Sequence, residues 1–219
     1  MNKNFLRAIL IAEKVFEELP FFVRPGVTEK RVADEIRWRL KSYGAHKESF
    51  RIIVASGKRS ALIHGFATNK KIKCGDIIMF DFGALYRNWR SDITRTYVVG
   101  KPTARQKKIY EILKRAQAAG LKKAKHGVKC SEVDKAVRGV IKRAGYELKH
   151  GSGHGVGSKT HEAPRISKKS GHVLKDGDVV TIEPGIYIKN WGGMRIEDMV
   201  LVTHIGPKIL TQVKRTLSL

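Results

Sequence analysis

The sequence predicts an α+β fold made of two similar halves. Each half contains an amphipathic helix, a second helix and then a strand-rich stretch, in that order. The repeat also has a fixed offset, because Gly26 and Gly44 recur 101 residues later as Gly127 and Gly145. Duplicated halves tend to place a binding site at their junction, where each half contributes residues. We therefore expect one domain over residues 1–219, with pseudo-repeats over about 1–100 and 101–219.

Four helices are indicated by apolar residues that recur at helical spacing. In the first half we expect a helix over about 5–19 and another between 26 and 44, with Val32, Ile36 and Leu40 on its buried face. In the second half we expect a helix over about 103–125, with Thr103 as its N-cap, and another between 127 and 145.

Strand-rich stretches follow each helix pair. We expect strands within 50–55 and 76–99 in the first half, and within 179–188 and 194–203 in the second. Residues 92–97 alternate with the two-residue period of a strand, and residues 77–80 form an apolar run that is typical of a buried strand.

The composition is strongly basic. Lys and Arg number 44 against 20 Asp and Glu, which gives a net charge of +24. Such an excess attracts polyanions such as RNA through counterion release. A solvated, lysine-rich surface is the alternative, and no basic motif with interleaved aromatic residues accompanies the charge. We therefore expect no more than a weak association with nucleic acid or the ribosome.

No signal peptide or membrane span is expected, because four charged residues between positions 13 and 18 interrupt the apolar start of the chain. Cys74 and Cys130 have no CxxC spacing and give no disulfide framework. These features predict a cytoplasmic protein.

Four carboxylates lie within or at the ends of the apolar strands, at Asp81, Asp92, Glu183 and Glu197. Taken singly, each is typical of a strand-end group that faces solvent. A carboxylate at the end of a buried strand is, however, unfavourable unless it is paired or binds a metal ion. Several such carboxylates together favour a shared metal site.

One histidine joins this set. His154 lies in the segment GSGHGVG, residues 151–157, whose glycines allow the backbone to approach another group closely. Alone it would be an ordinary loop histidine. With the four carboxylates it forms a ligand set that suits two divalent ions such as Mn, Co, Fe or Zn. Structural zinc is disfavoured, because it normally uses cysteines.

The chain resembles the creatinase/methionine aminopeptidase superfamily, and most closely its Xaa-Pro dipeptidases (prolidases). The segments that carry the likeness are DFGALYRNWRSDITRTYVVG, GHGVGSKTHEAPRI, TIEPGIYI and RIEDMVLVT. The five metal-ligand positions match in order: Asp81 and Asp92 stand 11 residues apart, His154 and Glu183 stand 29 apart, and Glu183 and Glu197 stand 14 apart. The resemblance extends over most of the chain from about residue 50 and implies the pita-bread fold around a dinuclear metal site.

The resemblance also implies roles for site residues. Metal ions would lower the pKa of a bridging water, and Glu183 would carry its proton to the leaving amine. His64 and His161 match histidines that bind the substrate or the tetrahedral intermediate. Arg165 matches an arginine that binds the free carboxylate of a dipeptide, with a plain surface arginine as the alternative. Arg195 is expected beside a ligand carboxylate.

The expected function is therefore hydrolysis of Xaa-Pro bonds in dipeptides or short peptides by a single metallopeptidase domain. Two alternatives remain open: an aminopeptidase that removes another N-terminal residue such as methionine, and a non-catalytic module that binds nucleic acid or protein. Prolidases usually carry an N-terminal domain before the catalytic one, and we expect it to be absent here. A homodimer is a further expectation.

Overall fold

The computed structural model describes all residues, 1–219. The expected helices are present as two pairs of equal length: α1 Lys3–Phe22 and α3 Ala104–Lys123 have 20 residues each, and α2 Glu29–Ser42 and α4 Cys130–Arg143 have 14 each. Thr103 caps α3 in a capping box with Gln106.

The four glycines that mark the sequence repeat lie in the turns just before and just after the two shorter helices, α2 and α4, and they share one backbone conformation. Gly26, Gly44, Gly127 and Gly145 have φ angles of 92°, 100°, 80° and 82°, in the left-handed region that glycine tolerates. Each helix pair therefore enters and leaves its shorter helix through an equivalent turn. This is the physical reason for the 101-residue offset.

The strands form four sheets. In the first half β2, β3 and β6 pair antiparallel, and β1, β4 and β5 form a small sheet beside them. In the second half the order is β13-β12-β9-β7-β8, and β10 and β11 form a separate pair. The bounds are β1 Lys47–Glu48, β2 Ile53–Ser56, β3 Ile77–Phe82, β4 Ala84–Tyr86, β5 Trp89–Arg90, β6 Ile93–Val98, β7 Gly153–Gly155, β8 Glu162–Ile166, β9 Val179–Ile182, β10 Gly185–Ile188, β11 Gly192–Arg195, β12 Asp198–Leu201 and β13 Lys208–Ile209.

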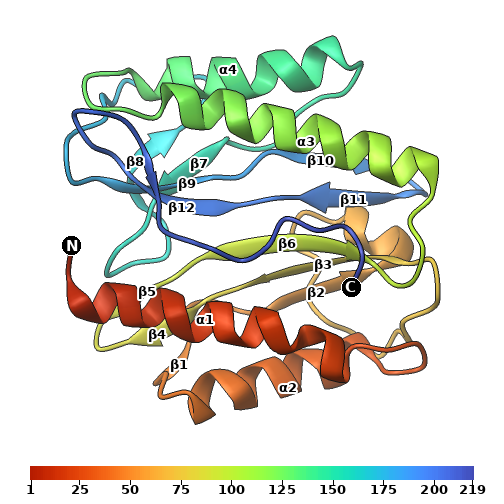
Figure 1. Ribbon diagram of the computed structural model, residues 1–219. Helices are drawn as coiled ribbons and strands as arrows, with labels where there is room; N and C mark the ends of the chain where they lie inside the picture. The colour runs from red at the N-terminus through yellow and green to blue at the C-terminus, as the bar shows by residue number, and fades with distance from the viewer.

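The two helix pairs lie on opposite outer faces of the strands, with α3 and α4 on one side and α1 and α2 on the other (Figure 1). Each pair covers its own large apolar core, and Val32, Ile36 and Leu40 of α2 are fully buried as predicted. The strands of the two halves therefore face each other in the middle of the molecule, where the predicted site residues lie.

Backbone and side-chain hydrogen bonds join the halves at this junction. The Glu197 amide donates to the Thr94 carbonyl at 3.1 Å, and the Thr96 hydroxyl donates to the Arg195 carbonyl at 2.9 Å. These contacts fix β6 of the first half against the β11–β12 segment of the second. The residues that the sequence predicts as metal ligands, which come from both halves, are consequently held beside one another.

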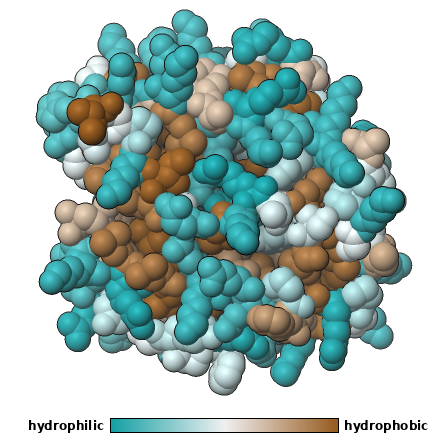
Figure 2. All heavy atoms as spheres, viewed as in Figure 1, coloured by the Kyte–Doolittle hydropathy of each residue, from teal (hydrophilic) through white to brown (hydrophobic).

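The face viewed in Figure 2 is mainly hydrophilic at its edge, with a few apolar residues there, and further apolar groups lie towards its middle. None of the four helices combines the length and the apolar character that crossing a membrane requires.

Candidate active site

A cavity of about 410 Å³ opens between the two halves. All eight predicted site residues line it: His64, Asp81, Asp92, His154, His161, Arg165, Glu183 and Glu197. The structure thus brings together residues that are up to 133 positions apart in the sequence. Asp81, Asp92, His154 and Glu197 are buried and Glu183 is half-buried, whereas His64, His161 and Arg165 are exposed.

The four carboxylates lie where strands end or break. Asp81 is near the end of β3, and Asp92 comes directly before β6. Glu183 comes directly after β9, and Glu197 lies between β11 and β12 rather than inside a strand as expected. Asp81 is still paired with Ile53 of β2 and Thr94 of β6, whereas the other three carboxylates lie just outside the strands.

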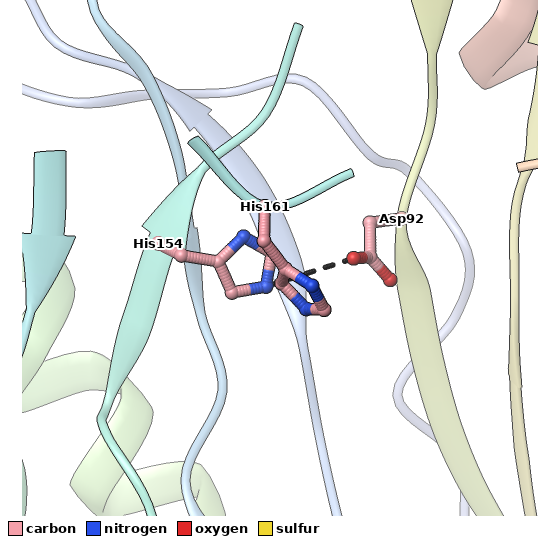
Figure 3. Close-up of side chains that lie close together, drawn as sticks. All are labelled: Asp92, His154 and His161. Atoms are coloured by element: carbon pink, nitrogen blue, oxygen red, sulfur yellow. Dashed lines mark ion pairs between the residues drawn. The ribbon is translucent and has the colours of Figure 1, made fainter. Parts of the chain in front are cut away.

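The ligand atoms of these residues lie close enough to share metal ions. Three groups have ligand atoms that all lie within 4.8 Å of one another: Asp81 with Asp92 and Glu197, His154 with Glu183 and Glu197, and Asp92 with His154 and His161. The His154 Nε2 atom is 3.4 Å from Glu183 Oε1 and 3.7 Å from Asp92 Oδ2. Figure 3 shows the His154 ring directed at Asp92, with His161 beside it.

Glycines on either side of His154 allow β7 to pack closely against its neighbouring strands. A Cβ atom on Gly153 would lie 1.9 Å from the Thr181 carbonyl oxygen, and one on Gly155 would lie 2.3 Å from the Ala163 carbonyl oxygen. Real Cβ atoms do not approach backbone so closely, so β7 can pack between β8 and β9 only with glycine at these positions. The close backbone approach expected of this segment is therefore present.

Burial perturbs the protonation of the carboxylates. It raises the pKa of Asp92 and Glu197 well above their ordinary values, and the neighbouring carboxylates raise it further. Burial also raises the pKa of Glu183. Like charges in a desolvated space repel one another, so the ionised forms of these carboxyl groups are unfavourable in the protein alone. Bound cations would stabilise the ionised forms.

The protonation state and tautomer of His154 suit a metal ligand. Burial lowers the pKa of His154, so its imidazole is neutral near pH 7. Nδ1 lies 3.1 Å from the Gly155 carbonyl oxygen, which can only accept, so Nδ1 carries the proton. Nε2 therefore directs a lone pair at the carboxylate oxygens of Glu183 and Asp92.

Two observations show that divalent cations fit this site. The lone pair of His154 Nε2 faces the oxygens of Asp92 and Glu183, and all of these atoms are acceptors when the two carboxyl groups are ionised. In addition, Asp81 Oδ1 is the only buried side-chain nitrogen or oxygen in the protein without a hydrogen-bond partner. Buried polar atoms are nearly always satisfied, and an exception points to a missing partner such as an ion. A cation between these atoms satisfies all of them.

Surrounding residues orient the carboxylates. Arg195 pairs with Asp81 through Nη2, as expected of a residue beside a ligand, and its Nε donates to Thr94 Oγ1 at 3.1 Å. The Thr94 hydroxyl in turn donates to Glu197 Oε2 at 2.6 Å. One arginine thus fixes two carboxylates, one directly and one through a threonine.

The exposed end of the cavity carries the three residues expected to contact substrate. The His161 ring lies 4.3 Å from the His154 ring, edge to face. Although its side chain is partly open to solvent, desolvation within the cavity and the neighbouring His154 lower the pKa of His161 to about 4. His161 is therefore a neutral hydrogen-bonding group at physiological pH. Arg165 lies in β8 directly opposite His154 in the strand register.

Sequence reasoning missed His150 as a site residue. It lines the cavity, and its Nδ1 lies 2.7 Å from the Gly151 carbonyl oxygen, so Nε2 accepts from the Tyr187 hydroxyl at 2.9 Å. That hydroxyl also accepts from Arg195 Nη1 at 2.7 Å. The available signal was that His150 precedes His154 by four residues next to the same glycine-rich segment.

Comparisons with known proteins agree with this geometry. The chain is 47% identical over 213 residues to an Xaa-Pro dipeptidase of Pyrococcus furiosus, covering 96% of this chain and 61% of that protein. An Xaa-Pro dipeptidase structure from Bacillus anthracis superposes with a TM-score of 0.96 at 44% identity, covering 99% of this chain and 61% of that one. An X-Pro aminopeptidase structure from Thermotoga maritima gives a TM-score of 0.96 at 39% identity, covering 99% and 62%.

These structural matches confirm the pita-bread fold, and the chain spans about 61% of the length of the curated relatives it matches. The model of metallopeptidase family M24 matches residues 3–204, which include every predicted site residue. A metallopeptidase family and a cavity that fits metal ions agree with each other. The chain therefore belongs to metallopeptidase family M24.

Proposed function

We propose that this chain is a metal-dependent peptidase that hydrolyses Xaa-Pro bonds in dipeptides. The observation that carries the proposal is the position of His154 Nε2, which faces the carboxyl groups of Asp92 and Glu183 in an arrangement that bound cations would stabilise. The relatives named Xaa-Pro dipeptidase support the choice of bond. The unpaired Arg165 at the exposed end of the cavity supports the choice of a short substrate.

Asp81, Asp92, His154, Glu183 and Glu197 would hold two divalent ions. When bound, such ions polarise a substrate carbonyl and acidify water, so that a nucleophile exists near neutral pH. The chain's part is to fix the ligands before the substrate arrives. The contacts from Arg195 and Thr94 to Asp81 and Glu197 do this.

Glu183 is the residue best placed to move a proton. It lies in the cavity beside His154, and only the Thr181 hydroxyl donates to it, at 3.3 Å. Burial raises its pKa, which brings the carboxylate nearer to the range in which it can both accept and release a proton. We assign to Glu183 the transfer of a proton to the leaving amine.

His64, His161 and Arg165 would position the substrate. A neutral His161 donates one hydrogen bond and accepts another, so it can bind the scissile carbonyl region without adding charge. Arg165 offers a planar fork of N–H groups that matches the free carboxylate of a dipeptide. Because Arg165 has no carboxylate partner within the protein, it can pair with this carboxylate without first breaking a salt bridge.

Release of a residue from longer peptides is the second candidate. It is favoured by the similarity to an X-Pro aminopeptidase structure at the same TM-score as the dipeptidase. Removal of methionine from longer chains and a non-catalytic binding role stay weaker alternatives, because the spacing of Glu183 and Glu197 resembles prolidases and all five ligands are together. Homodimerisation, and binding of nucleic acid by the basic surface, stay predictions.

The experiment that separates these functions is hydrolysis of Met-Pro, Met-Ala and a tetrapeptide that begins with Met-Pro. Each is tested with added Mn²⁺ or Co²⁺ and again with chelator. Chelator-sensitive cleavage of Met-Pro alone is the expected result. Cleavage of the tetrapeptide favours an aminopeptidase, and failure to cleave any of the three substrates while metal is bound contradicts the proposal.

A further inference from the structure

Two of the three arginines that line the cavity have no hydrogen-bond or salt-bridge partner in the protein. Arg195 pairs with Asp81, whereas the guanidinium groups of Arg51 and Arg165 form no salt bridge or hydrogen bond with any residue. Both are exposed, unlike the carboxylates behind them. An arginine held in a binding cavity without a counterion is available to an anionic group of a ligand.

Arg51 is held in place by an aromatic ring. Its guanidinium carbon lies 3.9 Å from the centre of the Phe66 ring, and that ring lies 6.4 Å from the His64 ring at an angle of 25°. Stacking of this kind restrains a long side chain while leaving its N–H groups at the edge free. Arg51 therefore presents its donors on the same wall of the cavity as His64.

Arg165 approaches from the other half of the chain. Arg51 lies two residues before β2, and Arg165 lies in β8, opposite His154. A single carboxylate is bound by one guanidinium fork. Two divalent ions would balance the four carboxylates, so the two unpaired arginines leave the cavity with a positive excess. The arrangement suits a substrate that carries two separate anionic groups.

The chemistry of an Xaa-Pro dipeptide identifies the second group. Its free carboxylate is assigned to Arg165 in the proposed function. Proline has no ionisable side chain, so the only other anion such a dipeptide can carry is an acidic side chain on its first residue. We propose that Arg51 is a specificity-determining residue that binds this side chain, and that the enzyme prefers Glu-Pro and Asp-Pro to neutral dipeptides. The inference rests on the proposed function.

The test compares Glu-Pro with Gln-Pro, which has nearly the same shape and no side-chain charge. The ratio of their kcat/KM values is measured for the wild type, Arg51→Gln, Arg51→Lys and a control, Arg105→Gln. Arg105 also stacks over an aromatic ring, that of Trp191 at 4.8 Å, and does not line the cavity. If no dipeptide is hydrolysed, the same dipeptides are titrated calorimetrically against the metal-loaded proteins, in which this charge balance holds.

In the wild type we expect Glu-Pro to be favoured about five-fold, as for one partly exposed charge pair. Arg51→Gln should abolish the preference through loss of Glu-Pro cleavage alone, Arg51→Lys should keep part of it, and Arg105→Gln should keep all of it. Equal cleavage of both dipeptides by the wild type would overturn the inference. So would an equal loss for both in Arg51→Gln. If no dipeptide is hydrolysed, the proposed function fails, and the calorimetric preference still decides the role of Arg51.

Discussion

The Nε2 atom of His154 lies 3.4 Å from Glu183 Oε1 and 3.7 Å from Asp92 Oδ2. His154 donates through Nδ1 to the Gly155 carbonyl, so the lone pair of Nε2 faces both carboxyl groups. His154 and Glu183 come from neighbouring strands of the second half: His154 is the middle residue of β7, and Glu183 directly follows β9. A contact between two acceptors is unfavourable in a buried site, so a bound cation changes the energetics of the whole cavity.

Metal binding should stabilise the fold. A cation that binds the folded chain and not the unfolded one stabilises the fold by mass action. At a cation concentration of a hundred times Kd, the free energy of unfolding rises by about 2.7 kcal/mol, and the melting temperature rises with it. We expect Mn²⁺ to raise the Tm of the wild type by several degrees. His154→Ala should lose most of this rise, and exposed His172→Ala should keep it. Scanning calorimetry with and without chelator measures the effect, and equal rises in both variants would contradict it.

The buried carboxylates predict a pH dependence in the metal-free protein. The pKa of Glu197 is raised by burial above its ordinary value of 4.5, so folding favours the protonated form. Its contribution to stability is therefore present at low pH and is lost as the pH rises above 4.5 and through the folded-state pKa. Glu197→Gln, which stays neutral, should become more stable than the wild type by about 1–3 kcal/mol towards pH 8. Urea unfolding at pH 4.5 and pH 8 checks this, and a difference that shrinks with pH would be inconsistent with it.

Arg195 should matter for activity more than for folding. Its guanidinium holds Asp81 directly and Glu197 through Thr94. Arg195→Lys keeps the charge and loses the fork, and we expect metal affinity or kcat to fall about 10–100-fold. Arg37→Lys is a suitable control, because Arg37 pairs with Asp34 and Glu48 outside the cavity. Unchanged activity in Arg195→Lys at saturating metal and at limiting metal would exclude the role.

Gly153 should not tolerate a side chain. An added Cβ would lie 1.9 Å from the Thr181 carbonyl oxygen, a collision with backbone that only movement of β7 or β9 can relieve. We expect Gly153→Ala to destabilise the protein by about 1–3 kcal/mol or more and to displace His154. Gly171→Ala is the matched control, because its added Cβ would have no atom within 4 Å. Similar unfolding midpoints for the two variants would argue against the tight packing of β7.

Helix positions and the two-half fold could be predicted because they depend on local signals. Apolar periodicity located all four helices, and Thr103 was recognisable as a cap. The end of α1 was less accurate, since the helix continues through Pro20 to Phe22. A proline removes only one hydrogen-bond donor near a helix end, so it did not end the helix there.

The candidate site was predicted where charge appeared in an apolar setting. Asp81 follows an apolar run, and His154 stands among glycines. Strands β7 and β8 were not predicted, because glycines and polar residues hide the strand period there and pairing with β9 decides the conformation. His150 has only a weak local signal, its position beside the glycine-rich segment, and Arg51 has none. Their importance depends on contacts with Tyr187 and Phe66 that only the fold creates.

The measurement that tests the central claim most directly is the rate of Met-Pro hydrolysis as Co²⁺ is titrated into metal-free protein. We predict that activity rises with added metal, levels off near two ions per chain and disappears with chelator. Asp92→Asn, which removes one ligand charge from the cavity, should bind less metal and be inactive at the same concentrations. Full occupancy by two ions without hydrolysis of Met-Pro, or hydrolysis that survives chelation, would contradict the account.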